Sequence, residues 1–309
     1  MTAVAALAAT AFLLGVIAGP ALGRSSWPHR LPGVTMAAWL GILAGTLAAL
    51  AGLVSMALLG RPGLGHHLIE WLLSCLKHHK HPSSNTTYVI SVLPLMAAIT
   101  LAAIAFRRYR HTLLQRRHHR DALGFVVDPM RDFQDVCLIN HPLPVVYCLP
   151  ERERQIVMSK GALDRLDNAQ LHAVLCHERA HLGGRHHFVL ALNDAAGSAL
   201  GWLPSFRTAR DHLPPLLEMI ADDEAATHSG PHIVAAALRR LAVLPCPAGA
   251  LAAGSADRSI LAQRLARLEA GTTPHGVCAH MLSRVAIAFF AVTPLIICAL
   301  WAAAIPLFC

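Results

Sequence analysis

The sequence predicts a mostly α-helical, multi-pass membrane protein with four transmembrane helices and a cytoplasmic α+β domain. Composition supports the membrane assignment, because 55% of the 309 residues are hydrophobic and only 14% are charged, against about 25% charged in a soluble domain. A helix needs about 20 apolar residues to cross a bilayer. Uncharged stretches of about that length cover residues 2–23, 34–60, 88–106 and 285–308.

The basic residues beside these stretches predict the orientation of the chain. Residues 107–120 follow the third stretch and contain six Arg and no acidic residue. Because Lys and Arg concentrate on the cytoplasmic side, we expect residues 107–284 to form a cytoplasmic domain and both termini to lie outside. Residues 1–23 lack the positive n-region of a signal peptide, so we interpret them as a membrane helix.

The outer loop, residues 61–87, is then the longest outer segment, and it is rich in histidine. We expect it to receive a signal from outside, with a metal ion or pH as the stimulus. An amphipathic helix lying on the membrane surface is the alternative interpretation. This topology also permits a disulfide between Cys75 and Cys309, whereas the eight cysteines include no C-x-x-C pair.

The net charge of +8 does not indicate a nucleic-acid partner. The basic residues flank the membrane stretches, and no basic surface interleaved with aromatic residues is evident, so we expect no direct nucleic-acid binding. Their position predicts the lipid bilayer as a partner.

Two short runs rich in β-forming residues, 144–149 and 155–159, are separated by a polar loop and predict a β-hairpin. An extended peptide could add to its edge, or the hairpin could simply cover the core. Residues 188–203 are apolar but contain Asn193 and Asp194. This segment predicts either a helix at the membrane or a buried core helix.

His177-Glu178-Arg179-Ala180-His181 fits the pattern H-E-x-x-H within an apolar segment, 171–182, that we expect to be helical. Asp167 and Asn168 are good N-cap residues, and Gly183-Gly184 is a good end. Residues four apart share a helix face, so both imidazoles can bind one Zn²⁺ while Glu178 activates a water. The chain has 20 His, but composition does not explain a Glu between two of them on an apolar helix.

A third ligand is expected in the segment 216–227. Glu218 and Asp222 lie one turn apart there, as expected for a zinc ligand and an acidic group that orients a motif histidine. The alternative is a solvated acidic helix face, which we expect for Asp223 and Glu224. His228 is a candidate proton donor.

At this point the chain resembles the integral-membrane metallopeptidases of the BlaR/MecR type. The likeness covers the order of the parts and the segments 145–147, 156–163, 171–181, 202–204 and 218–222. It implies a gluzincin-like domain with Zn²⁺ bound by His177, His181 and Glu218, Glu178 as general base, and Asp222 as the acid one turn later. Residues 264–268 resemble the short Arg-containing helix that often follows.

The resemblance further implies a signal-transducing protease whose substrate is a cytoplasmic DNA-binding repressor of the BlaI/MecI type, and it leaves a homodimer open. The well-known members carry a penicillin-binding domain after the last helix, which we do not find here. The acidic residue that usually follows the zinc helix is also missing, and His186-His187 occupy that region. Two alternatives remain: a quality-control protease of the HtpX type, and a non-catalytic sensor of metal or envelope state.

Overall fold

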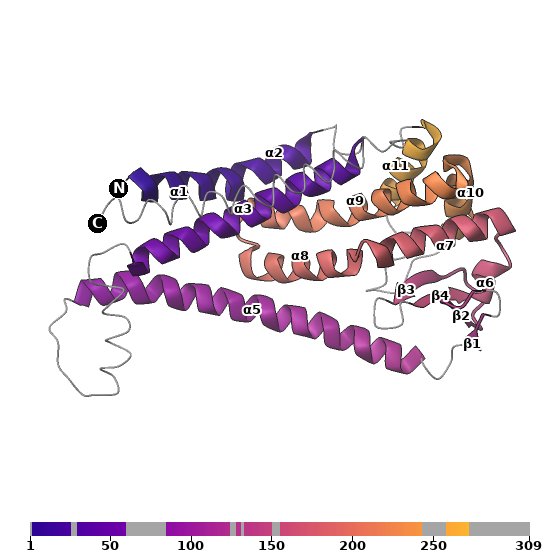
Figure 1. Cartoon of the computed structure of the whole chain (residues 1–309), viewed down its shortest axis with the longest axis horizontal. Coiled ribbons are helices and arrows are strands. Elements are labelled where there is room, and N and C mark those ends of the chain that lie inside the picture. Colours follow the sequence, from indigo (N-terminus) through magenta and orange to yellow (C-terminus); the bar gives the residue numbers. More distant parts are fainter. Residues whose placement is uncertain are drawn as a thin grey trace.

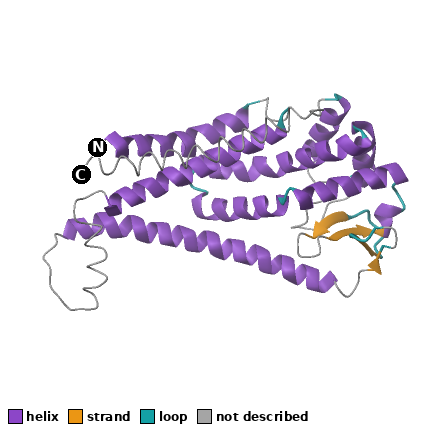
Figure 2. Cartoon of the chain, viewed as in Figure 1, coloured by secondary structure: helices purple, strands orange, loops and turns teal. Residues whose placement is uncertain are grey.

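The computed structural model describes residues 2–25, 30–59, 85–123, 128–130, 133–149, 155–242 and 258–271. These residues are mostly helical, with one small sheet at one end of an elongated bundle (Figure 2). Residues 61–84 of the expected outer loop 61–87, the fourth expected helix 285–308 and the Cys75–Cys309 pair lie outside the described residues, whereas residues 85–87 are helical.

Two helical segments near the N-terminus form the first part of the bundle. The first contains α1 (Thr2–Phe12), the π-helical segment η1 (Leu13–Ala18) and α2 (Gly19–Arg24), and α3 (Pro32–Leu59) follows. Within the described residues, Val4–Arg24 and Pro32–Ser55 are long and apolar enough to cross a membrane. These two segments coincide with the first two expected spans and indicate membrane association.

Hydrogen bonds connect the π-helical segment to the start of helix α9 (Pro204–Ser229). The Ser205 hydroxyl donates to the Leu14 carbonyl at 2.6 Å and accepts from the Gly19 N–H at 3.1 Å. Ser205 is fully buried, and a Cβ on Gly19 would lie 2.6 Å from the Ser205 Cα. The backbone of the first apolar segment therefore packs directly against α9.

The third expected span and the Arg-rich stretch after it form one continuous helix, α5 (Asn85–Leu123). Figure 1 shows α5 running from one end of the bundle toward the sheet. It packs along α8 (His186–Leu200). Asp194 on α8, whose presence made the segment 188–203 ambiguous, accepts a hydrogen bond from Arg108 of α5 at 2.6 Å. Phe188 and Leu192 are nevertheless exposed, so only one face of α8 is buried.

The sheet has the strand order β1-β2-β4-β3. The strands are β1 (Asp128–Pro129), β2 (Val136–Ile139), β3 (Val146–Leu149) and β4 (Gln155–Ser159). β3 and β4 pair antiparallel, which confirms the predicted hairpin. β4 also pairs parallel to β2, and the sequence did not predict this pairing. β3 is therefore an edge strand of the described sheet, and it packs against α7 (Asn168–Gly183).

Helix α9 is longer than the sequence predicted. It begins at Pro204 and passes through Pro214 and Pro215, each of which lacks a backbone donor. The helix persists because Phe206, Leu213 and other apolar side chains of its first half are buried against α3 and α8. Tertiary packing thus outweighs the two lost hydrogen bonds.

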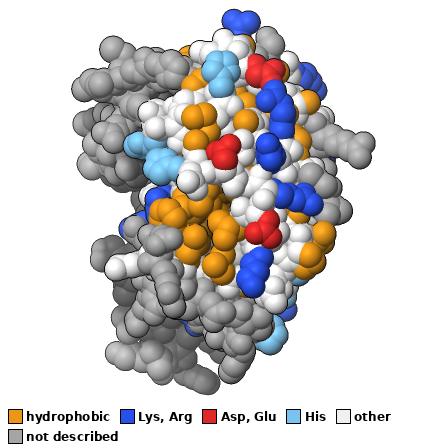
Figure 3. Space-filling model, turned by 90° about the vertical axis from the view of Figure 1, so that its right-hand side faces the viewer, with side chains coloured by type: hydrophobic (Ala, Val, Ile, Leu, Met, Phe, Trp, Pro, Cys, Tyr) orange, Lys and Arg blue, Asp and Glu red, His pale blue; other side chains and the backbone are white. Residues whose placement is uncertain are grey.

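The remaining helices close the end of the molecule that holds the sheet. They are α6 (Lys160–Leu163), α10 (Pro231–Leu241) and α11 (Arg258–Glu269). One apolar core lies between the sheet, α7, α10 and α11, and a second between α3, α8 and α9. Seen end-on, this part of the surface carries a row of Lys and Arg side chains beside an apolar patch (Figure 3). Charged groups thus gather at the end that also carries the motif helix.

Candidate metal centre

Helix α7 carries the H-E-x-x-H motif. The Asp167 carboxylate accepts from the Gln170 backbone N–H at 2.9 Å, and the Gln170 side chain accepts from the Asp167 N–H at 3.4 Å. This capping box satisfies backbone donors that a helix start leaves unpaired. The Arg179 guanidinium also donates to both oxygens of Asp135, at 2.8 and 2.9 Å, which fixes the helix to the start of β2. The cap and the helix therefore form where the sequence predicted them.

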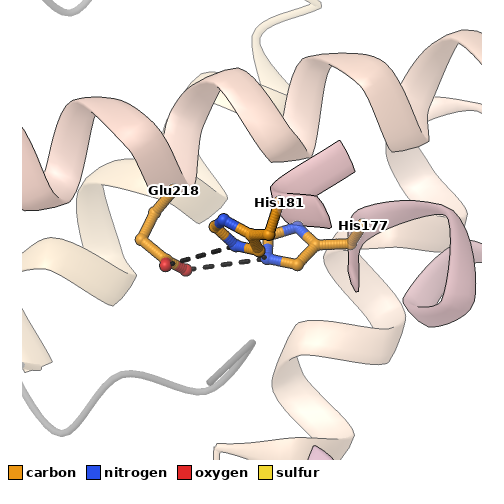
Figure 4. Close-up of side chains that lie close together, drawn as sticks. All are labelled: His177, His181 and Glu218. Atoms are coloured by element: carbon orange, nitrogen blue, oxygen red, sulfur yellow. Dashed lines mark hydrogen bonds and ion pairs between the residues drawn. The ribbon is translucent and has the colours of Figure 1, made fainter. Parts of the chain in front are cut away.

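Three side chains from α7 and α9 converge in the interior. The Nε2 atoms of His177 and His181 lie 3.1 Å apart, and the Glu218 carboxylate lies 3.6 and 3.4 Å from them respectively. Figure 4 shows the two rings and the carboxylate pointing toward one another. Among the described residues, these three form a buried group that could hold a metal ion, with ligand atoms within 4.8 Å of one another. Two imidazoles and one carboxylate are a common donor set for zinc.

The outer nitrogens of both histidines have partners of their own. His177 Nδ1 lies 3.1 Å from the Asp222 carboxylate, and His181 Nδ1 lies 2.7 Å from His186 Nδ1. A proton on each Nδ1 leaves the Nε2 lone pairs directed at the space between the rings. Partners of this kind fix the tautomer and orientation of metal-binding histidines. The donor set and its surroundings therefore fit zinc.

Arg264 of α11 supplies the positive charge for this cluster of acids. It is fully buried and donates to both oxygens of Asp222 at 2.7 Å, and its Nη1 lies 2.9 Å from Glu218. Burial alone would raise the pKa of Glu218, but Arg264 and then the two histidines lower it to about 2. The pKa of Asp222 is lowered in the same way, chiefly by Arg264. Both carboxylates are therefore ionised at neutral pH.

The two motif histidines differ in protonation in the metal-free protein. Burial lowers the pKa of His177, but hydrogen bonds and charges from Asp222 and Glu218 outweigh it and raise the pKa to about 9. Burial lowers the pKa of His181 to about 3, against the opposing charge of Glu218. A metal ion must displace the His177 proton, so we expect metal binding to release protons.

Glu178 lies beside the three converging groups and is fully buried. Neither of its carboxylate oxygens has a well-formed hydrogen bond among the described residues, although the Cys148 thiol of β3 lies near enough to lower its pKa slightly. Burial raises the pKa of Glu178 to about 8 despite the nearby His177. A buried carboxylate without good partners is poised to hold a water and to accept its proton.

The structure separates the other acidic and histidine candidates from this cluster. His228 is about half exposed and lies 3.5 Å from Glu224 one turn before it, so it is not brought to the centre as the proton-donor prediction required. Glu224 is a surface residue, as expected. Asp223 is not, because it is largely buried and pairs with Arg267 at 2.5 Å. Cys176 lies near His172 rather than among the candidate ligands.

Sequence reasoning missed two members of the site. Arg264 entered the sequence analysis only through the resemblance. Its pairing with Asp222 could not be predicted, because the two residues are 42 positions apart in the chain. His186 was noted only as occupying the place of an absent acid. The signal in the sequence was a side chain able to form hydrogen bonds five positions after His181, and the structure shows that it contacts His181.

The comparisons with known proteins agree with a metallopeptidase site. The sequence model of Peptidase family M48 matches residues 108–204, which include the H-E-x-x-H motif and end before Glu218. This match covers less than half of the chain. Neither the curated proteins nor the solved structures contain a significant match. The match and the buried His-His-Glu group together support a metallopeptidase.

Proposed function

We propose that the protein is a membrane-embedded zinc metalloendopeptidase. One observation carries the proposal: His177, His181 and Glu218 converge around a common point. The buried carboxylate of Glu178, which has no well-formed hydrogen bond among the described residues, lies beside them. The match to Peptidase family M48 and the two apolar N-terminal segments support it independently.

In this proposal His177, His181 and Glu218 bind Zn²⁺, and Asp222 orients His177. Bound zinc supplies a Lewis acid that polarises the scissile carbonyl and makes a water acidic enough to deprotonate near neutral pH. Glu178 takes a proton from the water that attacks the carbonyl carbon. It then gives this proton to the amide nitrogen as the C–N bond breaks.

The edge strand β3 offers a surface for the substrate. Among the described strands β3 pairs with β4 alone, and Cys148 on it lies near Glu178. An extended peptide that added to the free edge of β3 would pass the catalytic carboxylate. We therefore propose that the enzyme cleaves extended segments of a protein chain.

We further propose a signalling role, with a cytoplasmic repressor of the BlaI/MecI type as the substrate. Its basis is the resemblance of the motifs and the order of the expected helices: three before the zinc domain and one after it. A quality-control protease of the HtpX type is the competing proposal. The M48 match is compatible with both.

Substitution of Glu178 tests the hydrolase proposal. Purified full-length protein in detergent should contain about one Zn²⁺ per chain, and Glu178→Gln should retain it, because this residue is not a ligand. Loss of the general base should slow peptide hydrolysis about 10²–10⁴-fold. Normal turnover by Glu178→Gln, or wild-type protein without bound zinc, would reject the proposal.

The choice of substrate separates the two protease types. A purified winged-helix repressor and unfolded casein should be offered to the same preparation. Cleavage of the repressor at a defined site, with little action on casein, supports signalling. The reverse result supports quality control.

A further inference from the structure

We infer that His186 is a positioning residue for the candidate metal ligand His181, and that Arg116 links it to the long helix α5. This inference rests on the proposed zinc site. It concerns the start of α8, where the resemblance leads one to expect an acidic residue and the sequence has His186-His187.

The contact between the two histidines defines the role of His186. His181 Nδ1 and His186 Nδ1 lie 2.7 Å apart, so one of them must donate a hydrogen bond. If His181 binds metal through Nε2, its proton is on Nδ1, and the His186 Nδ1 lone pair must accept it. His186 is 5% exposed, and the two rings meet edge to face with centroids 4.8 Å apart. His186 therefore fixes both the tautomer and the ring plane of His181.

The turn before α8 is shaped to place the His186 ring. Arg185 adopts φ of 50°, a left-handed conformation that non-glycine residues rarely adopt. A Cβ on Gly184 would lie 2.5 Å from His186 Nε2 and 2.7 Å from its Cδ2. A Cβ on Gly183 would meet nothing within 4 Å. The absence of a side chain at residue 184 is thus required by the present position of the ring.

Helix α5 holds this turn from the outside. Both Nη atoms of Arg116 lie 3.2 Å from the carbonyl oxygen of His187, the residue next to His186. Tyr109 of α5 also packs edge-on against Phe188, with ring centroids 6.4 Å apart. A displacement of α5 relative to α7 would therefore move the first turn of α8 and the acceptor that holds His181.

The closing experiment measures metal binding by purified full-length protein in detergent. Zn²⁺ affinity is determined by competition with a chelator, and the ligand geometry is determined from the absorption bands of the Co²⁺-loaded protein. We expect His186→Phe, which keeps a ring but removes the acceptor, to weaken Zn²⁺ binding about 10–100-fold and to shift the Co²⁺ bands. His186→Asn should restore affinity to within a few fold of wild type, because Oδ1 is as many bonds from the backbone as Nδ1.

Two neighbouring pairs of residues provide matched controls. Gly184→Ala should act like His186→Phe, because the added methyl displaces the ring, whereas Gly183→Ala should behave as wild type. Arg116→Ala should weaken binding several-fold, and Arg117→Ala, at an exposed position beside it, should not. Thermal unfolding of the metal-free variants reports whether each still folds.

Each outcome has a distinct meaning. If wild type binds Zn²⁺ and both His186→Phe and Gly184→Ala bind it equally well with unchanged Co²⁺ bands, the role of His186 is rejected while the proposed function stands. Equal affinity of Arg116→Ala and wild type rejects the link to α5. A wild-type protein that binds no metal overturns the proposed function, and this inference with it.

Discussion

The Arg264 guanidinium donates a hydrogen bond of 2.7 Å to each oxygen of the Asp222 carboxylate, and both side chains are shielded from solvent. Asp222 in turn lies 3.1 Å from His177. Three helices, α7, α9 and α11, thus meet in one chain of polar contacts. The candidate metal centre depends on a cation that lies well beyond the motif helix in the sequence.

Removal of the Arg264 side chain should lower the unfolding temperature of the domain. Arg264→Ala leaves the two buried carboxylates, Asp222 and Glu218, with protonated His177 as the one cation beside them among the described residues. Loss of one member of a buried ion pair typically costs about 3–5 kcal/mol in the free energy of unfolding. Thermal unfolding of metal-free protein, followed by circular dichroism, measures the effect.

An exposed ion pair provides the control for this substitution. Arg239 pairs with Glu269, and both side chains are about half exposed. Exposed pairs contribute about 0–1 kcal/mol, so Arg239→Ala should change the unfolding temperature little. Equal destabilisation by the two substitutions would show that the buried Arg264–Asp222 pair contributes no more to the free energy of unfolding than the exposed pair does.

Metal content should depend on three residues and not on their neighbours. Single substitutions of His177, His181 or Glu218 by Ala should each cause strong loss of zinc, because a tetrahedral site with three protein ligands cannot spare one. His172→Ala on α7 removes an exposed imidazole and Glu224→Ala on α9 a half-exposed carboxylate, and both should leave zinc in place. Elemental analysis of the purified variants distinguishes them. Retention of zinc by all three ligand variants would contradict the assignment.

The stability of the metal-free protein should fall as pH rises from 6.5 to 9. The pKa of His177 is raised from 6.5 to about 9 in the folded state, so its contribution is complete below pH 6.5 and is lost as pH rises through 9. Glu178, with its pKa raised by burial to about 8, changes stability in the same direction up to that pH. At about 1.4 kcal/mol per pKa unit, His177 accounts for about 3 kcal/mol and Glu178 for about 2 kcal/mol, so the total loss should be on the order of 5 kcal/mol.

Thermal unfolding of metal-free protein across this pH range tests that expectation. Asp222→Asn removes a charge that raises the pKa of His177, so its profile should be flatter than that of wild type. Zinc-loaded protein should show little slope in the same range, since coordination keeps His177 neutral. A metal-free profile that rises with pH would show that the assigned protonation of His177 is wrong.

The orientation in the membrane remains a prediction with a direct measurement. Reporter fusions near Gly161 should be active only with reporters that work in the cytoplasm, because the Arg-rich segment 107–120 favours that side. Fusions in the loop 61–87 should give the opposite result. An outside signal near Gly161 would overturn the topology, and a cytoplasmic repressor could then not be the substrate.

Local patterns allowed a correct prediction of several elements. The apolar segment with Asp167 before it and Gly183-Gly184 after it formed helix α7, and the two β-type runs formed the β3–β4 hairpin. Spacing alone placed Glu218 and Asp222 on one helix face, and the structure turns that face toward the motif. These features depend on contacts within a few residues or on helical periodicity.

Contacts between distant parts of the chain could not be predicted in the same way. The parallel pairing of β2 with β4 joins runs separated by the whole of β3. The pairing of Arg264 with Asp222 spans 42 positions, and no local pattern predicts it. Pro214 and Pro215 hid the first half of α9, because helix propensity predicts a break where burial maintains the helix.

Leu14 and Gly19 are five residues apart, the spacing of a π-helical hydrogen bond, and the Ser205 hydroxyl lies between their backbone groups as both donor and acceptor. Few residue types at position 205 can both donate to the Leu14 carbonyl and accept from the Gly19 N–H. Alanine would leave a buried N–H and a buried carbonyl without this partner, and a larger polar side chain would need room that the close approach of Gly19 does not leave. In related sequences that keep this contact, residues 19 and 205 should therefore change together. A one-residue deletion within 13–18 should be accompanied by loss of the hydroxyl at position 205.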